Sequence, residues 1–258
     1  MGVVAVVLGI LSSAASGATF AAPIDKESTT RVADYSLSFP GTDSGVTVRD
    51  SAALQLDRKN AFTVAFWTYL RRIDNNPLPR FWEKNPHYLC VMGDSSNTQF
   101  GKIGLEVANA SGTGNQNGGV TEFWGSTRLQ TNTWYFVAAT FDGSKQSSQA
   151  QIYVNGVPEK MRIIYPWSGQ MFSTAGRAWA IGRRLNDFAR GLDGQLDAMV
   201  VYPTAFTKRQ IQALYRGRYP AFGAAADWEF NEGFGSVVND SSGNGNVGAI
   251  TEATYVRR

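Results

Sequence analysis

From residue 35 onward, hydrophobic and polar residues alternate in short runs that are separated by turn-forming residues. Residues 61–70 form a long apolar run that places Phe62, Val64 and Phe66 on one face of an extended chain. Further strand-like runs occupy residues 35–39, 103–107, 120–124, 134–141, 151–154, 179–181 and 196–202. Short strands at this spacing predict an all-β protein built as a sandwich or a barrel.

Two local signals define a turn and a helix within this pattern. Asn155-Gly156 follows an apolar run and is the strongest short signal for a β-hairpin. Thr207 opens a Thr-Lys-Arg-Gln capping box, and apolar residues follow it at helical spacing as far as Tyr215. Gly217 then provides a C-terminal cap. The sequence therefore predicts one short helix near residues 207–216.

Composition narrows the functional classes. The 258 residues are 43% hydrophobic and 12% aromatic, which supports a packed core and excludes a largely disordered chain. The net charge is +3, but the basic residues come in small pairs without a long run, so nucleic acid is not an expected partner. Cys90 and His87 are the single residues of their types, which excludes an intrachain disulfide and a Cys/His zinc site.

Several motifs in a fixed order carry a family resemblance. They are residues 37–48, 62–67, 134–142, 152–156 (Ile-Tyr-Val-Asn-Gly), 181–205 and the helical segment 207–216. In this order they resemble the laminin-G-like domains of the concanavalin A-like lectin/glucanase superfamily. The resemblance implies a jelly-roll, a two-sheet antiparallel β-sandwich, whose rim loops bind glycans, proteins or calcium. It does not by itself fix which of these functions the chain has.

The resemblance also suggests the domain organisation. We expect one laminin-G-like sandwich over residues 30–258. The stretch Trp228–Gly235, with Asp240–Gly245 and Gly248, resembles a segment that often begins such domains. Here we expect residues 226–258 to form terminal edge strands or to pack beside the sandwich. Residues 1–29 precede the sandwich as an apolar arm or a signal-like segment, too short in its apolar part to span a membrane. The apolar residues of this arm are Val3, Val4, Val6, Val7, Leu8, Ile10 and Leu11.

Catalytic chemistry has little support in the sequence. Glycosidases with this fold carry alternating acidic residues on a strand, and the most similar pattern here is Asp227, Glu229 and Glu232. Glu232 falls out of phase with the other two, so we expect a terminal strand that buries Trp228 and Phe230 and leaves its acids in water. The chain is therefore predicted not to be an enzyme.

The resemblance implies that binding residues lie in the loops at the rim of the sandwich. Calcium is bound by Asp and Asn oxygens, and the candidate ligands are Asp43, Asp94, Asn155, Asp193 and Asp197, each of which also has a structural role as a turn former or cap. Candidate glycan-contacting residues lie beside polar or turn segments; they are Trp82, Trp124, Trp167, Asn115 and Asn117. Trp67 and Trp134 lie in apolar runs and are expected in the core.

These observations leave two main functional hypotheses. The leading one is a non-catalytic surface or assembly protein that decorates a virion or similar particle, anchored to other protein subunits by its arm. The alternative is a secreted carbohydrate-binding or adhesion module, with or without calcium. A glycoside hydrolase on the same fold is a weaker third hypothesis. No cofactor other than calcium is expected, and surface glycans are the other expected partner.

Overall fold

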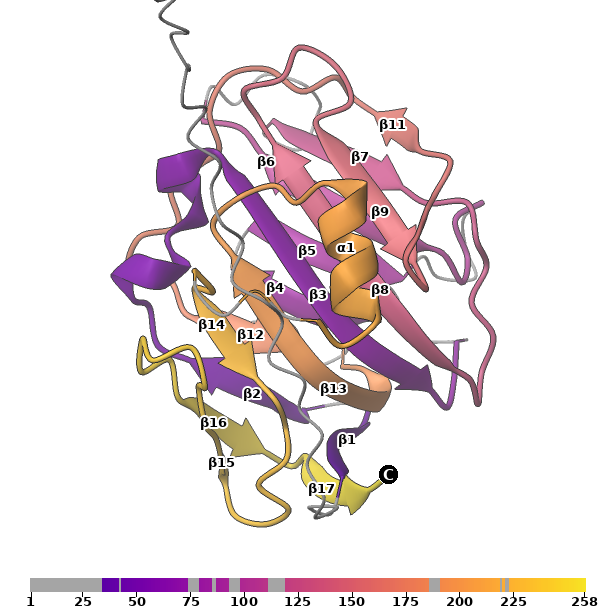
Figure 1. Cartoon of the computed structure of the whole chain (residues 1–258), viewed down its shortest axis with the longest axis vertical. Helices are drawn as coiled ribbons and strands as arrows, with labels where there is room; N and C mark the ends of the chain where they lie inside the picture. Colours follow the sequence, from indigo (N-terminus) through magenta and orange to yellow (C-terminus); the bar gives the residue numbers. More distant parts are fainter. Residues whose placement is uncertain are drawn as a thin grey trace, which may run out of the picture. The chain divides into compact units, whose positions relative to one another are not determined.

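The computed structural model describes most of the chain beyond residue 33. The described residues are 34–41, 43–73, 79–84, 87–92 (backbone only), 98–110, 119–185, 191–218, 220 and 223–258. Within them the chain forms two antiparallel sheets that face each other, so the predicted sandwich is confirmed and a barrel is excluded (Figure 1).

The first sheet, sheet A, is centred on the long strands β3, β8 and β13. Its strands run in the order β10 (Val157–Pro158), β9 (Ala150–Val154), β8 (Trp134–Asp142), β3 (Ala61–Leu70), β13 (Asp193–Tyr202), β1 (Tyr35–Pro40) and β17 (Thr254–Arg257), with β14 (Ala226–Trp228) pairing to β13. Asn155 and Gly156 both have positive φ between β9 and β10, which is the hairpin geometry that the sequence predicted.

The second sheet, sheet B, carries the edge where the candidate site lies. Its order is β11 (Arg162–Ile164), β7 (Val120–Trp124), β6 (Ile103–Ala108), β5 (His87–Met92), β4 (Arg80–Lys84), β12 (Trp179–Ile181), β2 (Gly45–Val48), β16 (Gly248–Thr251) and β15 (Val237–Val238). The 3₁₀ helices η1 (Ala52–Leu54) and η2 (Leu56–Lys59) connect β2 to β3.

The core lies between the two sheets. Phe62, Val64 and Phe66 of β3 all point into it and are buried, as their period-two spacing predicted. From sheet B, Trp82 of β4 stacks on Trp179 of β12 with 4.9 Å between ring centroids. Aromatic residues of both sheets therefore fill the interior, and their burial is the main source of stability.

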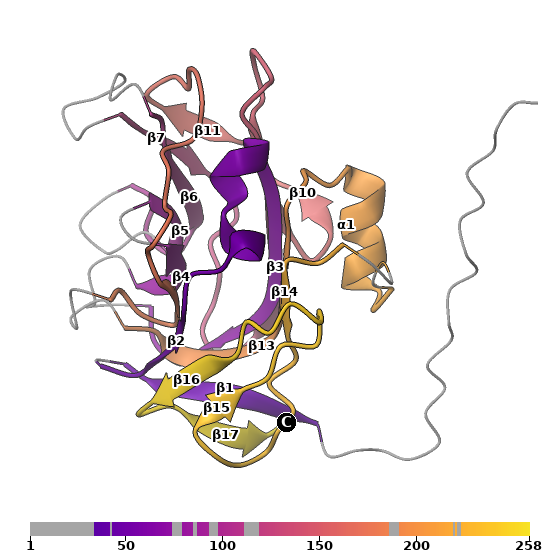
Figure 2. The same cartoon turned by 90° about the vertical axis from the view of Figure 1, so that its left-hand side faces the viewer.

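Helix α1 (Lys208–Tyr215) covers part of the outer face of sheet A (Figure 2). The predicted capping box is present, because the Thr207 hydroxyl accepts from the Gln210 backbone N–H and the Gln210 side chain accepts from Thr207. Ile211 and Leu214 are buried against the sheet, while Tyr215 packs beside Trp67. Among the described residues, no helix is long and apolar enough to cross a membrane.

The C-terminal segment contributes to both sheets. Strands β15 and β17 lie at sheet edges, and β16 is an internal strand between β2 and β15. Trp228 and Phe230 are fully buried, which confirms the expectation for these two side chains. The segment therefore completes the sandwich instead of packing beside it.

Candidate functional site

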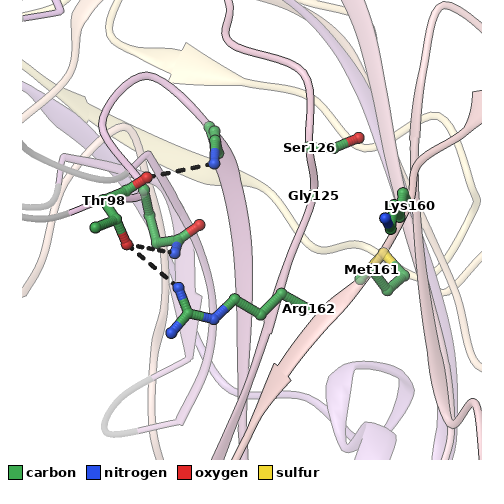
Figure 3. A pocket seen from close by; sticks show the side chains of 8 residues that line it. Thr98, Gly125, Ser126, Lys160, Met161 and Arg162 are labelled. Atoms are coloured by element: carbon green, nitrogen blue, oxygen red, sulfur yellow. Dashed lines mark hydrogen bonds between the residues drawn. The ribbon is translucent and has the colours of Figure 1, made fainter.

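An open hollow of about 210 Å³ lies at the edge of sheet B and is surrounded by basic and polar side chains (Figure 3). We call it the basic hollow. The residues that line it are Thr98, Gln99, Lys102, Gly125, Ser126, Lys160, Met161 and Arg162. They come from three segments that are distant in sequence.

Sheet pairing brings these three segments together. Strand β6 begins at Ile103, β7 ends at Trp124 and β11 begins at Arg162, and these strands are neighbours in sheet B. Because adjacent strands are antiparallel, the start of β6 and the end of β7 meet at the same end of the sheet. Trp124 packs over Gly104, where a Cβ atom would come within 2.6 Å of its ring, so a glycine is required there.

Thr98 organises one wall of the basic hollow. Its hydroxyl accepts hydrogen bonds from Nη1 of Arg162 at 3.2 Å and from Nε2 of Gln99 at 2.9 Å. Its carbonyl oxygen accepts from Nζ of Lys102 at 3.3 Å. Figure 3 shows Arg162 reaching across to Thr98, with Lys160 and Met161 farther along the same segment. Two cations are thus held in place by neutral oxygen atoms.

Glu159 fixes the opposite wall. Its Oε2 accepts from the backbone N–H groups of Ser126 at 2.8 Å and Thr127 at 2.5 Å, and from the Ser126 hydroxyl at 3.1 Å. Its Oε1 accepts from the Thr127 hydroxyl at 2.8 Å. These four hydrogen bonds fasten the loop after β7 to the segment before β11, and they engage both oxygens of the carboxylate.

The basic hollow has an excess of positive charge. Within the described part of the chain, Lys102, Lys160 and Arg162 form no ion pair with a carboxylate. Arg128, on the loop after β7, adds a further cation close by and lies over the Phe100 ring at 5.1 Å. A hollow lined by one sign of charge concentrates ions of the opposite sign, so the arrangement is suited to binding an anionic or highly polar ligand.

The three tryptophans predicted to lie at the rim are in the interior. Trp82 is 0% exposed and stacks on Trp179. Trp124 is 3% exposed and its indole N–H donates to Glu122, while Trp167 is 8% exposed and donates to the carbonyl of Gly143. The predicted rim position of these rings is therefore wrong. Each ring packs against a neighbouring strand or aromatic side chain, so the nearby polar residues did not indicate exposure.

The opposite correction applies to Trp67 and Trp134. Both were expected in the core, but they lie half-buried on the outer face of sheet A, where they are covered in part by the Arg258 guanidinium. Arg258 lies 4.1 Å above the Trp134 ring and forms an ion pair with Asp197. Burial raises the pKa of the Asp197 carboxyl to about 7, although the positive charge of Arg258 acts in the opposite direction.

Asn155 and Asp193, two of the predicted calcium ligands, have structural partners, whereas the Oδ1 atom of Asp43 is buried without a hydrogen bond. Asn155 accepts the Phe136 backbone N–H at 2.9 Å, and Asp193 forms an ion pair with Arg71 at 2.9 Å. Asp43 occupies a turn with φ +62°. No group of three or more His, Cys, Asp or Glu side chains gathers in the described residues to hold a metal ion. The calcium site therefore stays a prediction.

Several other predicted residues fall outside the described part of the structure. They are Asp94, Asn115, Asn117, the seven apolar residues of the arm, and the side chains of His87 and Cys90. Asp227, Glu229 and Glu232, the acidic residues of the glycosidase-like pattern, lie within the described residues. Glu229 is exposed after β14. Glu232 accepts a hydrogen bond from the Asn239 backbone N–H and so links two parts of the segment between β14 and β16.

The sequence did not indicate the basic hollow. The local sequence signal for this site is Lys160-Met161-Arg162, which follows the predicted hairpin and places two cations on one short segment. The contributions of Lys102 and Ser126 depend on the pairing of β6 with β7, and no short motif reports that pairing.

Comparison with known families agrees with this architecture. A model of the laminin-G type, described as the concanavalin A-like lectin/glucanases superfamily, matches residues 40–212. The chain belongs to this superfamily. The match covers strands β2 to β13 of the two sheets and all of the basic hollow's lining, and it ends within helix α1. The expected family and fold are thereby confirmed.

Solved structures of superfamily type show the same fold at low identity. One, from Bacteroides ovatus, is named a "putative carbohydrate binding protein"; it is 20% identical with a TM-score of 0.65, over 87% of this chain and 60% of that chain. The binding domain of the Paraclostridial Mosquitocidal Protein 1 is 13% identical with a TM-score of 0.50, over 70% of this chain and 42% of that chain. A search of curated proteins found none that matches. This chain thus spans 60% or less of these two relatives.

Proposed function

We propose that this chain is a non-catalytic saccharide-binding module and that the basic hollow is its binding site. The observation that carries the proposal is the convergence of hydrogen-bonding groups from two loops and the start of strand β11 on one open hollow: Thr98 and Gln99, Ser126, and Arg162. A few fixed polar groups in a concave site orient a ligand, and sugar hydroxyls both donate to and accept from such groups. Membership of a lectin/glucanase superfamily supports the same reading.

The size of the basic hollow limits what it can enclose. Its volume of about 210 Å³ is below the roughly 300–1,000 Å³ of pockets that surround a drug-sized ligand. It therefore suits one unit or one substituent of a saccharide chain, with the rest of the chain lying across the sheet edge. Such a site favours an extended or repeating saccharide over a free monosaccharide.

The test uses the full chain on a panel of neutral and acidic oligosaccharides, with affinities measured by calorimetry. A Thr98→Val, Ser126→Ala variant removes two hydroxyls from the basic hollow and is expected to weaken binding at least about fivefold, on the order of one hydrogen bond. The matched control is Ser147→Ala with Thr251→Val, two exposed hydroxyls elsewhere. Binding that survives the first variant unchanged, or the absence of binding to every saccharide, would refute the proposal.

The assembly hypothesis is a second proposal that rests on the sequence of the arm. Its residues 3–11 lie outside the described residues, so the virion or particle setting, the protein-subunit partners and the alternative secreted location stay predictions. Size analysis of the native protein distinguishes them: a full-length chain recovered only in large particles supports assembly, and a free chain that binds saccharides does not. Hydrolysis of a bound saccharide, detected by mass spectrometry, would instead support the glycoside hydrolase.

A further inference from the structure

Among the residues that the structure describes, no carboxylate forms an ion pair with Lys102, Lys160 or Arg162 at the basic hollow. Lys102 and Arg162 donate only to neutral oxygens of Thr98 among the contacts of the described residues, and Lys160 is exposed. Three like charges that share one small hollow repel each other, and this repulsion is relieved when an anion binds among them. An exposed cation ordinarily needs no partner, but three that surround one hollow form a site for a counter-charge.

Glu159 is a described carboxylate beside the basic hollow, and its oxygens are engaged by the neighbouring loop. Glu159 stands next to Lys160 in the sequence, yet its two oxygens accept four hydrogen bonds from Ser126 and Thr127. A carboxylate that is held in this way braces the loop and does not neutralise the cations. The folded chain therefore preserves the positive charge of the hollow while it fixes the hollow's shape.

The donors around the basic hollow match the acceptors of an oxyanion. Arg162 presents a planar guanidinium of the kind that recognises sulfate and carboxylate groups through paired N–H donors, and one of its nitrogens is already oriented by Thr98. Lys102 and Lys160 add point charges, and the Ser126 hydroxyl and Gln99 amide add neutral groups. A neutral sugar would use the neutral groups and would leave the three cations uncompensated.

We infer that the basic hollow binds an acidic substituent of a saccharide, a sulfate ester or a uronic acid carboxylate, through Lys102, Lys160 and Arg162. This inference rests on the proposed saccharide-binding function and names the ligand class for the same site. Sulfate and carboxylate share the chemistry of an anionic group with several acceptor oxygens, so the experiment must separate the two sources.

The experiment compares four probes at 50 mM and 300 mM salt: a heparin tetrasaccharide, an oligogalacturonate of similar length, the neutral cellotetraose, and a dT12 oligonucleotide. The full chain is expected to bind one or both acidic saccharides at least about tenfold more tightly than cellotetraose at low salt, with a loss at high salt. A preference for heparin assigns sulfate, and a preference for oligogalacturonate assigns the carboxylate.

Variants then assign the binding to the basic hollow. Lys102→Gln, Lys160→Gln and Arg162→Gln are each expected to weaken acidic saccharide binding by about 3- to 10-fold, and the triple variant by at least about 30-fold. The control triple variant carries Lys59→Gln, Arg209→Gln and Arg216→Gln, all exposed, and lowers the net charge equally. The control variant should retain binding within about twofold, because salt screens the interaction between the ligand and charges far from the site.

The experiment distinguishes a failure of the inferred acidic ligand from a failure of the proposed saccharide-binding function. Equal affinity for cellotetraose and the acidic saccharides overturns the inference but leaves the proposed function standing. Equal loss in the two triple variants, or binding of dT12 as tight as that of the acidic saccharides, also overturns it, because binding would then follow overall charge. Absence of binding to any saccharide overturns both.

Discussion

Strand β4 and the basic hollow both hold basic side chains, but the surroundings of these side chains differ. Lys84 of β4 is 0% exposed; its Nζ forms an ion pair with Asp50 at 2.5 Å and donates to the Leu54 carbonyl at 3.0 Å. Lys160 at the hollow is exposed. A buried ammonium must be compensated, because its desolvation costs several kcal/mol, whereas an exposed one remains hydrated. The two regions therefore separate cations that maintain the fold from cations that are available to a ligand.

The carboxylate partners show the same division. Burial acts to raise the pKa of Asp50, but hydrogen bonds from Lys84, Gly176 and Gln55 and the charge of Lys84 outweigh it, so the pKa lies below its usual value. Asp50 thus stays ionised and holds the Lys84 charge in the interior. Glu159 at the basic hollow instead accepts hydrogen bonds from Ser126 and Thr127 of the loop after β7, and no ion pair joins it to the hollow's cations among the described residues. If this comparison is right, substitutions in β4 should alter stability, and those in the hollow should alter binding.

The largest effect is expected for Trp82→Ala in β4. The substitution removes a fully buried ring that stacks on Trp179 and contacts Phe62, so it should lower the free energy of unfolding by about 3–5 kcal/mol. Urea denaturation measures the change. Trp82→Phe fills part of the space and should fold with a smaller loss. A loss below about 1 kcal/mol in the alanine variant would show that Trp82 is not part of the core.

A smaller loss is expected for Lys84→Met. The methionine keeps much of the apolar volume but leaves Asp50 and the Leu54 carbonyl without their donor, so the expected loss is roughly 2–4 kcal/mol. Adding Asp50→Asn tests the pairing, because the double variant should lose less than the sum of the two single variants. Strictly additive losses, measured by urea denaturation, would mean that the two side chains act independently.

An intermediate case is the ion pair between Asp197 and Arg258 on the outer face of sheet A. Burial raises the pKa of Asp197 to about 7, above its value in the unfolded chain. A raised pKa in the folded state contributes stability that is fully present below about pH 4 and is lost as the pH rises through about 7. The expected decrease is on the order of a few kcal/mol, and the pKa of about 7 from which it follows already includes the attraction to Arg258.

Asp197→Asn removes this titration, and its thermal stability should change less between pH 4 and pH 7 than that of the original chain. Differential scanning calorimetry across this range checks the prediction. If the original chain instead gains stability relative to Asp197→Asn as the pH rises, then attraction to Arg258 exceeds the effect of burial. That outcome would place this pair with Lys84 and Asp50, as a pair that stabilises the fold when both groups are charged.

Local patterns predicted much of this structure, but only where the relevant physics is local. Period-two alternation located β3 and its buried face, Asn155-Gly156 located a hairpin, and Thr207 located the start of helix α1. Such signals depend on residues a few positions apart. The internal position of β16 between β2 and β15 could not be obtained in this way, because it depends on pairing between distant segments.

The candidate site was predicted less well than the fold, for a related reason. Polar neighbours suggested that Trp82 was exposed and apolar neighbours that Trp134 was buried, but the face of the sheet on which each ring lies decides its exposure. Trp82 points between the sheets and Trp134 points away from the core. The basic hollow joins Thr98, Ser126 and Arg162 from three segments that are distant in sequence, so its composition becomes visible only when the order of the strands in sheet B is known.

The smallest expected effect on stability concerns the basic hollow itself. The Lys160→Gln and Arg162→Gln variants should each change the free energy of unfolding by less than about 0.5 kcal/mol in urea, because both side chains are exposed and have no carboxylate partner among the described residues. Relief of repulsion could even make the triple variant slightly more stable at low salt. A loss above about 1 kcal/mol would mean that these cations stabilise the fold. If the free energy of unfolding is nearly unchanged while saccharide binding weakens, the charges of these side chains act in ligand binding and not in folding.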